Sequence, residues 1–191
     1  MKKGVVTGFI GLGFLILSGS VALAQNAKPI ETFAAFAASL GTGRAGRVNI
    51  TIHRWSTDAE RETLRTTLIE LGPDKLLDAL TKIRPPVGYM KTSNQITCDL
   101  FFARNNPTPD GGRHVVLATN RPVAFGEVVR STASMRYQFT LVEMHLDKDG
   151  KGEGKMVPAA KVTWNTDLKE IEIENYNALP VDLLGVVAKK P

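Results

Sequence analysis

The sequence predicts an α+β fold, in which an antiparallel β-meander forms a curved sheet, a sandwich or a partly closed barrel. Two observations indicate the sheet. Most segments after residue 87 alternate apolar and polar residues, the period of a half-buried strand, and turn sequences such as residues 109–112 and 149–150 separate them. A third observation indicates helices: residues 57–83 have apolar spacing that predicts an αα-hairpin, inserted after the second strand.

The first 24 residues have the three parts of a cleavable secretory signal peptide. Lys2 and Lys3 supply positive charge, residues 4–17 are apolar and uncharged, and residues 22–24 read Ala-Leu-Ala, the small-x-small pattern of a cleavage site. We therefore expect export to the periplasm or the cell exterior, with the mature chain starting at Gln25. An uncleaved membrane anchor is the alternative, because the uncharged stretch approaches the length of a spanning helix, about 20 residues.

The mature chain is expected to be a short tether, residues 25–31, followed by a single α+β domain, residues 32–191. It has one cysteine, Cys98, so no intrachain disulfide can form and packing must supply the stability. It carries 22 Lys and Arg against 19 Asp and Glu, an excess of +3. Because this charge is scattered, we expect no nucleic-acid partner, and no stable membrane insertion once the signal is cleaved.

Residues 32–40 and 47–55 are expected to form a β-hairpin around the glycine-rich stretch 41–46. In the second arm the apolar residues Val48, Ile50 and Ile52 alternate with polar ones. The first arm is rich in alanine and could be helical instead.

The next element is predicted to be a helix that begins after Thr57. Thr57 with Glu60 makes a capping box, and Gly72 ends the helix. Residues 73 and 74 start a second helix, which the two prolines at 85 and 86 stop. The expected buried faces of the two helices consist of Leu64, Leu68, Leu71, Leu76, Leu77, Leu80 and Ile83.

The remainder is predicted to be strands, eight or nine in all with the first hairpin. A short helical turn is expected near residues 125–129. In the long strand over residues 135–146 the apolar phase changes after residue 141, which a β-bulge or burial on both sides would explain. The expected strands after the helices cover residues 87–91, 96–102, 114–119, 135–146, 156–164, 171–173 and 181–187.

Two hairpin registers follow from the turns. A two-residue loop at 149–150 places Phe139 opposite Ala160, Tyr137 opposite Val162 and Met135 opposite Trp164.

A loop centred on residues 166–167 places Val162 opposite Ile171 on the buried face and Ala160 opposite Ile173. It also places Lys161 opposite Glu172 on the outer face.

Four stretches of the chain resemble a family of exported bacterial proteins of unknown function. They are WSTDAER at 55–61, PDGGR at 109–113, LATNRP at 117–122 and FTLVEMHLDKDGKGEGKM at 139–156. The resemblance covers most of the mature chain and implies export and a shared fold. It assigns no site residue, because the family has no assigned activity.

Candidate chemistry is sparse. His53, His114 and His145 lie in separate segments without a local metal-ligand spacing; His145, near Glu143 and Asp147, is the first place where they could converge. Cys98 alternates with apolar residues and is interpreted as core rather than a reactive thiol. The acidic row of Glu170, Glu172 and Glu174 is expected to be a solvated strand face paired with Lys161 and Thr163.

Two loops resemble ligand sites only superficially. Residues 147–153 have alternating oxygen ligands but lack the ligand and glycine positions of a calcium-binding EF-hand. Residues 41–46 lack the spacing of a phosphate-binding loop.

We assign no catalytic, cofactor-binding or metal residue and no cofactor from the sequence. The partner is left unknown. The favoured hypothesis is a non-catalytic binding or interaction module of the cell envelope. Two alternatives stay open: a small-ligand carrier with a cavity inside a barrel, and an enzyme whose residues assemble only in three dimensions.

Overall fold

The computed structural model describes residues 28–39, 43–93, 97–123, 138–175 and 179–191. The predicted signal peptide, the start at Gln25, the helical turn near 125–129 and the pairings of Met135 and Tyr137 lie outside the described residues.

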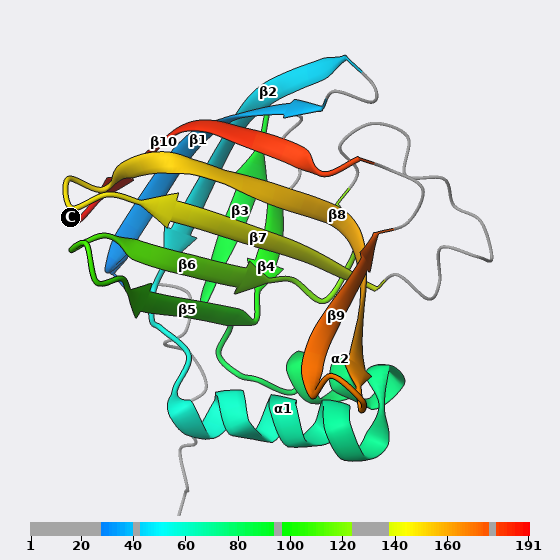
Figure 1. The fold of residues 1–191 in the computed structure, drawn as a ribbon. Helices are drawn as coiled ribbons and strands as arrows, with labels where there is room; N and C mark the ends of the chain where they lie inside the picture. The colour runs from blue at the N-terminus through cyan, green and yellow to red at the C-terminus, as the bar shows by residue number, and fades with distance from the viewer. Residues whose placement is uncertain (1–27, 40–42, 94–96, 124–137, 176–178) are drawn as a thin grey trace, which may run out of the picture.

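Ten antiparallel strands form one sheet that curls nearly into a barrel, with two helices inserted after β2 (Figure 1). The α+β prediction is therefore confirmed. The sheet order is β4-β3-β2-β1-β10-β8-β7-β6-β5, and β9 pairs with β8 beside this path. The strands are β1 Glu31–Ser39, β2 Arg44–Ile52, β3 Gly88–Thr92, β4 Thr97–Leu100, β5 Phe102–Pro107, β6 Arg113–Ala118, β7 Phe139–Leu146, β8 Lys151–Asn165, β9 Glu170–Asn175 and β10 Val181–Lys189.

The near-closure depends on the break between β4 and β5. These strands occupy the two ends of the sheet, yet only Phe101 separates them in the chain. The carbonyl of Leu100 accepts a hydrogen bond from Val87 before β3, whereas the N–H of Phe101 donates to Ala118 at the end of β6. The continuous segment from β4 to β5 thus contributes to both edges of the sheet and holds these edges near each other.

The first hairpin is confirmed, with Ser39 opposite Arg44 across its loop. The alanine-rich first arm is a strand, so its helical alternative is wrong. β1 pairs with β2 on one edge and with β10 on the other, and Phe33 and Ala37 are buried in the core.

The helices are α1 (Asp58–Leu71) and α2 (Pro73–Thr81). The predicted capping box is present: Glu60 N–H donates to Thr57 Oγ1 at 3.1 Å, and Thr57 N–H donates to Glu60 Oε2 at 2.8 Å. Gly72 ends α1 with a positive φ of 84°. Leu71 was expected on the buried face but is 64% exposed, because it is the last helical residue, where the chain turns into α2.

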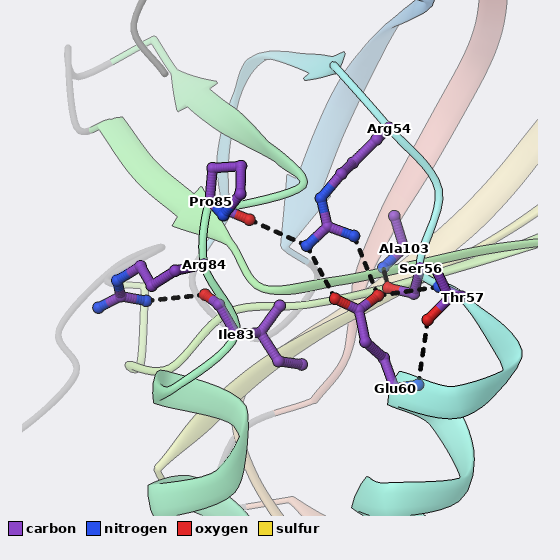
Figure 2. A network of polar contacts seen from close by, with 8 residues as sticks. All are labelled: Arg54, Ser56, Thr57, Glu60, Ile83, Arg84, Pro85 and Ala103. Carbon is purple, nitrogen blue, oxygen red and sulfur yellow. Dashed lines mark hydrogen bonds and ion pairs between the residues drawn. The ribbon is translucent and has the colours of Figure 1, made fainter. Parts of the chain in front are cut away.

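A polar network joins the start of α1 to the barrel (Figure 2). Arg54, just after β2, donates two 2.9 Å hydrogen bonds to the carboxylate of Glu60 and one to the carbonyl of Pro85. Ser56 N–H donates to the carbonyl of Ala103, and Ser56 Oγ accepts from Ala103 N–H. The start of α1 is thereby held against β5, and Arg54 links it to the segment that follows α2.

The apolar residues form two cores. One fills the interior of the barrel, and the other lies where the helices pack on the outside of the sheet. The largest fully buried side chains of the interior are Phe33, Ile50, Ile52, Met90, Leu100, Leu117, Met144, Met156 and Leu183. The second core consists of Leu64, Leu68, Leu76, Leu80, Phe101, Ala118, Phe139, Ala160 and Val162.

The β7–β8 hairpin has the predicted pair of Phe139 and Ala160. Its register shifts between Phe139 and Leu141, where β8 has one residue more than β7, so the bulge lies on β8 and not at the phase change expected after residue 141 of β7. The hairpin loop is one residue longer than expected. Leu146 lies opposite Gly152, and Gly150 adopts a positive φ of 74°, as in a turn followed by a left-handed residue. The bulge compensates this extra residue, which is why the pair at the far end of the hairpin still matches.

The predicted β8–β9 register is wrong by two residues. Lys161 lies opposite Glu174, not Glu172, and Val162 lies opposite Ile173, not Ile171; Ala160 likewise faces Asn175. The loop contains four residues, 166–169, because Asn165 Oδ1 accepts the N–H groups of Asp167 and Leu168 and widens the turn.

A shift by two residues preserves which face each side chain occupies. Lys161 therefore still meets a glutamate, with its Nζ 3.4 Å from Glu174 Oε2. The burial expected for Ile171 and Ile173 is wrong: they are 50% and 56% exposed. The cause is that, among the described strands, β9 pairs with β8 alone and lies beside the main path of the sheet.

Candidate functional site

An apolar cleft of about 270 Å³ lies outside the barrel, between the αα-hairpin, the sheet and β9. Figure 1 shows the β8–β9 hairpin extending beyond the sheet toward the two helices. The cleft is thus bounded by three elements that come from separate parts of the chain.

The helical wall consists of leucines placed one turn apart. Leu64 and Leu68 lie on one face of α1, and Leu76 and Leu80 lie on one face of α2. Residues four apart share a helix face, so each helix presents a short apolar stripe to the cleft. The same leucines belong to the outer core, and their positions are therefore set by packing.

The floor is the outward face of the strands. It contains Val116 and Ala118 of β6, whose inward neighbours Val115 and Leu117 are fully buried in the barrel. The remaining floor residues, from β5 and β7, are Phe102, Phe139 and Leu141.

The third wall comes from β8 and β9. Val162 is buried, whereas Ile171 and Ile173 are the two half-exposed isoleucines of β9. Exposed isoleucines on an edge strand leave apolar area in contact with water, and burying it under a ligand would be favourable.

Two arginines of α1 complete the lining, Arg61 and Arg65, again one turn apart. Arg65 donates to Glu62 at 3.0 Å, and its guanidinium lies 6.0 Å from the centre of the Trp164 ring. Within the described part of the chain the side chain of Arg61 has no ion pair, so its charge is available to a ligand.

The lining determines what the cleft can do. Twelve of its 14 residues are apolar and the other two are the arginines. Arginine stays protonated and only donates hydrogen bonds, so it is poorly suited to acid–base chemistry. The residues that line the cleft therefore favour binding a ligand with an apolar body and an anionic end.

Two of the three histidines come together, and they lie elsewhere on the outer face. His114 of β6 and His145 of β7 are cross-strand partners with stacked rings, 4.5 Å apart. Both Nε2 atoms approach Oε1 of Glu143, at 2.7 and 3.2 Å. His53 is not part of this cluster; its ring lies 5.9 Å from that of Tyr89.

Asp147, which we expected near His145, has a different role. Its Oδ1 accepts the N–H groups of Asp149 and Lys151 at 2.9 and 2.8 Å and so stabilises the β7–β8 turn. This carboxylate acts as a turn acceptor, which fits a plain hairpin loop rather than a calcium loop.

Cys98 is 1% exposed, as expected of a core residue, with Nη2 of Arg121 3.3 Å from its Sγ. The strand β9 carries its three glutamates in an exposed row. Asn165 Nδ2 donates to Glu172 at 2.6 Å and Lys161 pairs with Glu174, so polar partners from β8 face two of them.

The sequence reasoning missed the cleft, its two arginines and a buried ion pair between Glu31 and Arg113. The leucine stripes and Ile171 with Ile173 were visible as apolar patterns, but each was expected to be a buried face rather than the wall of a cleft. Nothing local indicates the ion pair, because 82 residues separate its members.

Comparison of the chain with protein-family models, with curated proteins and with solved structures finds no match. In the described ranges, no helix has both the length and the apolarity to cross a membrane. Export, the start at Gln25 and the family resemblance therefore stay predictions.

Proposed function

We propose that this chain is a binding module of the cell envelope that holds a small amphiphile in the cleft outside the barrel. The ligand has a short apolar body and an anionic head, such as a carboxylate, sulfate or phosphate group. The observation that carries the proposal is an apolar cleft with two arginines of one helix face among its lining.

The apolar lining supports the first half of this ligand. Transfer of one methylene group from water to such a surface contributes about 0.8 kcal/mol, so a few carbons supply useful affinity. Small-molecule sites usually have volumes of about 300 to 1,000 Å³, and a cleft of about 270 Å³ suits a short chain or a single ring.

The arginines support the second half. A guanidinium matches a planar or tetrahedral anion with paired N–H donors, and a charge-assisted hydrogen bond is stronger than a neutral one. Arg61 is the favoured contact because Arg65 is already engaged with Glu62 and Trp164.

A carrier with its cavity inside the barrel is the weaker alternative. The large inward side chains, among them Phe33, Met90 and Leu117, are 2% exposed or less and occupy the interior. The external cleft is therefore the better location for a small ligand. An enzyme would need reactive groups at that cleft. The described residues that line it are aliphatic, aromatic or arginine, which favours binding over catalysis.

Calorimetric titration of the protein with octanoate tests the proposal. We expect saturable binding, and weaker binding of octanamide, which has the same chain without the charge. Substitution Arg61→Glu should weaken octanoate binding by roughly threefold to tenfold. Lys91→Glu, which makes the same charge change on β3 outside the cleft, should leave binding unchanged.

A matched pair of apolar-to-alanine substitutions tests whether the β9 wall of the cleft contacts the ligand. Ile173→Ala should weaken binding of both ligands several-fold, whereas Leu168→Ala, in the loop of the same hairpin, should not. The proposal is wrong if octanoate fails to bind at millimolar concentration, or if the two cleft substitutions act no differently from their controls.

A further inference from the structure

We propose that the outer face of β6 and β7 carries a binding site for a divalent transition-metal ion, with His114, Glu143 and His145 as ligands. Imidazole nitrogens with one carboxylate oxygen are a donor set suited to zinc and to Cu²⁺, Ni²⁺ and Co²⁺. Zinc is the ion to which this proposal commits. The site is separate from the cleft and does not depend on the proposed function.

The three donors are already close together. One ligand atom from each residue lies within 4.8 Å of the others, and both Nε2 atoms contact the same oxygen of Glu143. Ligands bound at about 2.0 to 2.2 Å from a single ion lie roughly 3 to 3.6 Å from one another. The donor distances are therefore near those of a coordinating arrangement, and the orientation of one ring is what must change.

The donors are presented by two paired strands of the barrel. His114 and His145 are direct partners in the β6–β7 ladder, and Glu143 lies two residues before His145, so all three side chains leave the same face. Inward neighbours of the three, Val115 and Met144, are fully buried. An ion here would be held by neighbouring strands of the barrel rather than by a loop.

The nitrogen of His114 lacks a well-formed partner. Its Nε2 is shielded from solvent and lies 2.7 Å from Glu143 Oε1, but the two are not aligned for a hydrogen bond. A buried imidazole nitrogen without an aligned hydrogen bond is unfavourable in a plain surface cluster. A metal ion between the nitrogen and the carboxylate would satisfy both.

Binding requires one ring to turn. The imidazole planes are now within 12° of parallel, and a metal ion lies in the plane of each imidazole that ligates it. His145 is the ring that moves, because its side chain is 65% exposed whereas that of His114 is 29% exposed. Rotation of an exposed side chain about its own bonds is fast and inexpensive.

The neighbouring strand β8 supplies one helpful and one opposing charge. Glu153 is the cross-strand partner of His145 and borders the same shallow groove as Glu143, so it can provide a fourth ligand or a second anion near the ion. Lys155 is the partner of Glu143 and repels a cation. Because Lys155 is exposed, solvent and salt weaken that repulsion.

Calorimetric titration of the untagged protein with Zn²⁺ tests the site. We expect one ion per chain, and Co²⁺ in its place should give visible absorption bands of a ligand field containing nitrogen. His114→Ala, His145→Ala and Glu143→Gln should each weaken Zn²⁺ binding at least about tenfold.

The third histidine is the matched control: His53→Ala removes an imidazole away from the cluster and should leave Zn²⁺ binding unchanged. Circular dichroism of each variant shows whether it is folded, and Glu143→Gln preserves the size of an exposed side chain. Absence of Zn²⁺ binding at micromolar concentration would overturn the proposal and leave the cluster as a polar surface contact. Equal losses in His53→Ala and the cluster variants would also overturn it.

Discussion

At the scale of single residues, Glu60 combines two tasks. Its carboxylate completes the capping box of α1 and also receives the guanidinium of Arg54. The hydrogen bonds from Arg54 are the main cause that lowers the pKa of Glu60 below its ordinary value, and the N–H of Thr57 adds to this effect. The charged form is therefore the one that the fold stabilises.

This lowered pKa gives a pH-dependent prediction. Because the pKa of Glu60 is lower in the folded chain than in the unfolded one, its contribution is present above the unfolded value, near 4.5, and is lost as the pH falls through the folded value. Glu60→Gln keeps a side chain able to cap the helix but removes the charge.

We expect Glu60→Gln to lower the free energy of unfolding at pH 7 and to have a smaller effect near pH 3. Urea denaturation at the two pH values measures this difference. An equal loss at both would mean that the charge of Glu60 contributes nothing. Glu62→Gln, in an exposed pair with Arg65, is the control and should change little at either pH.

At the scale of elements, the β8–β9 hairpin makes the cleft. It forms one wall through Ile171 and Ile173, and its loop is shaped by Asn165, whose side chain accepts two loop N–H groups and donates to Glu172. Because β8 is the one described strand that pairs with β9, this loop is important for holding the wall in place.

Asn165→Ala should therefore loosen the hairpin more than the barrel. We expect a loss of about 1 kcal/mol in global stability and faster amide hydrogen exchange confined to residues 160–175. Hydrogen exchange followed by mass spectrometry checks both. Thr163→Ala, on the same strand but without a side-chain hydrogen bond to the loop, is the control. Unchanged exchange in β9 would show that its position does not depend on the loop.

At the scale of the whole molecule, a buried ion pair links strands that are not neighbours in the sheet. Glu31 begins β1 and is 3% exposed; its carboxylate accepts two hydrogen bonds from Arg113, which begins β6, at 2.5 and 2.9 Å. The strands β10, β8 and β7 lie between these two in the sheet order. The pair therefore spans one end of the barrel.

Arg113→Ala should destabilise the fold by about 3 to 5 kcal/mol, because it leaves the charge of Glu31 buried and unpaired. The double variant Arg113→Ala with Glu31→Gln should recover part of this loss, since no charge remains buried. Denaturant unfolding of both measures the effect. Lys75→Ala, which breaks an exposed pair with Asp78, is the control and should cost less than about 1 kcal/mol. A similarly small loss for Arg113→Ala would contradict the expectation.

Much of the fold could be predicted because its determinants are local. The Thr57–Glu60 capping box, Gly72 and the alternation of Val48, Ile50 and Ile52 each depend on residues a few positions apart. Registers were harder. A single extra residue in a loop moves every pair, and only the bulge beyond Phe139 restored the predicted partner of Ala160.

The candidate sites consist of residues that are far apart in the sequence, and no local sequence pattern indicates that they come together. His114 and His145 meet only because β6 pairs with β7 in one particular register, with no turn sequence joining them directly. The cleft exists because the αα-hairpin packs on the outward face of the sheet, opposite β9.

The sequence by itself therefore determined the types of most described elements, the capping of α1, the antiparallel class and the absence of an intrachain disulfide. These follow from local backbone preferences, the side-chain period and the presence of one cysteine. The tertiary structure alone decided that the sheet closes nearly into a barrel, that two histidines share one carboxylate, and that Ile171 and Ile173 face a cleft. The physical reason is that closure, register and docking minimise the free energy of the whole chain, to which contacts between distant residues contribute as much as local ones.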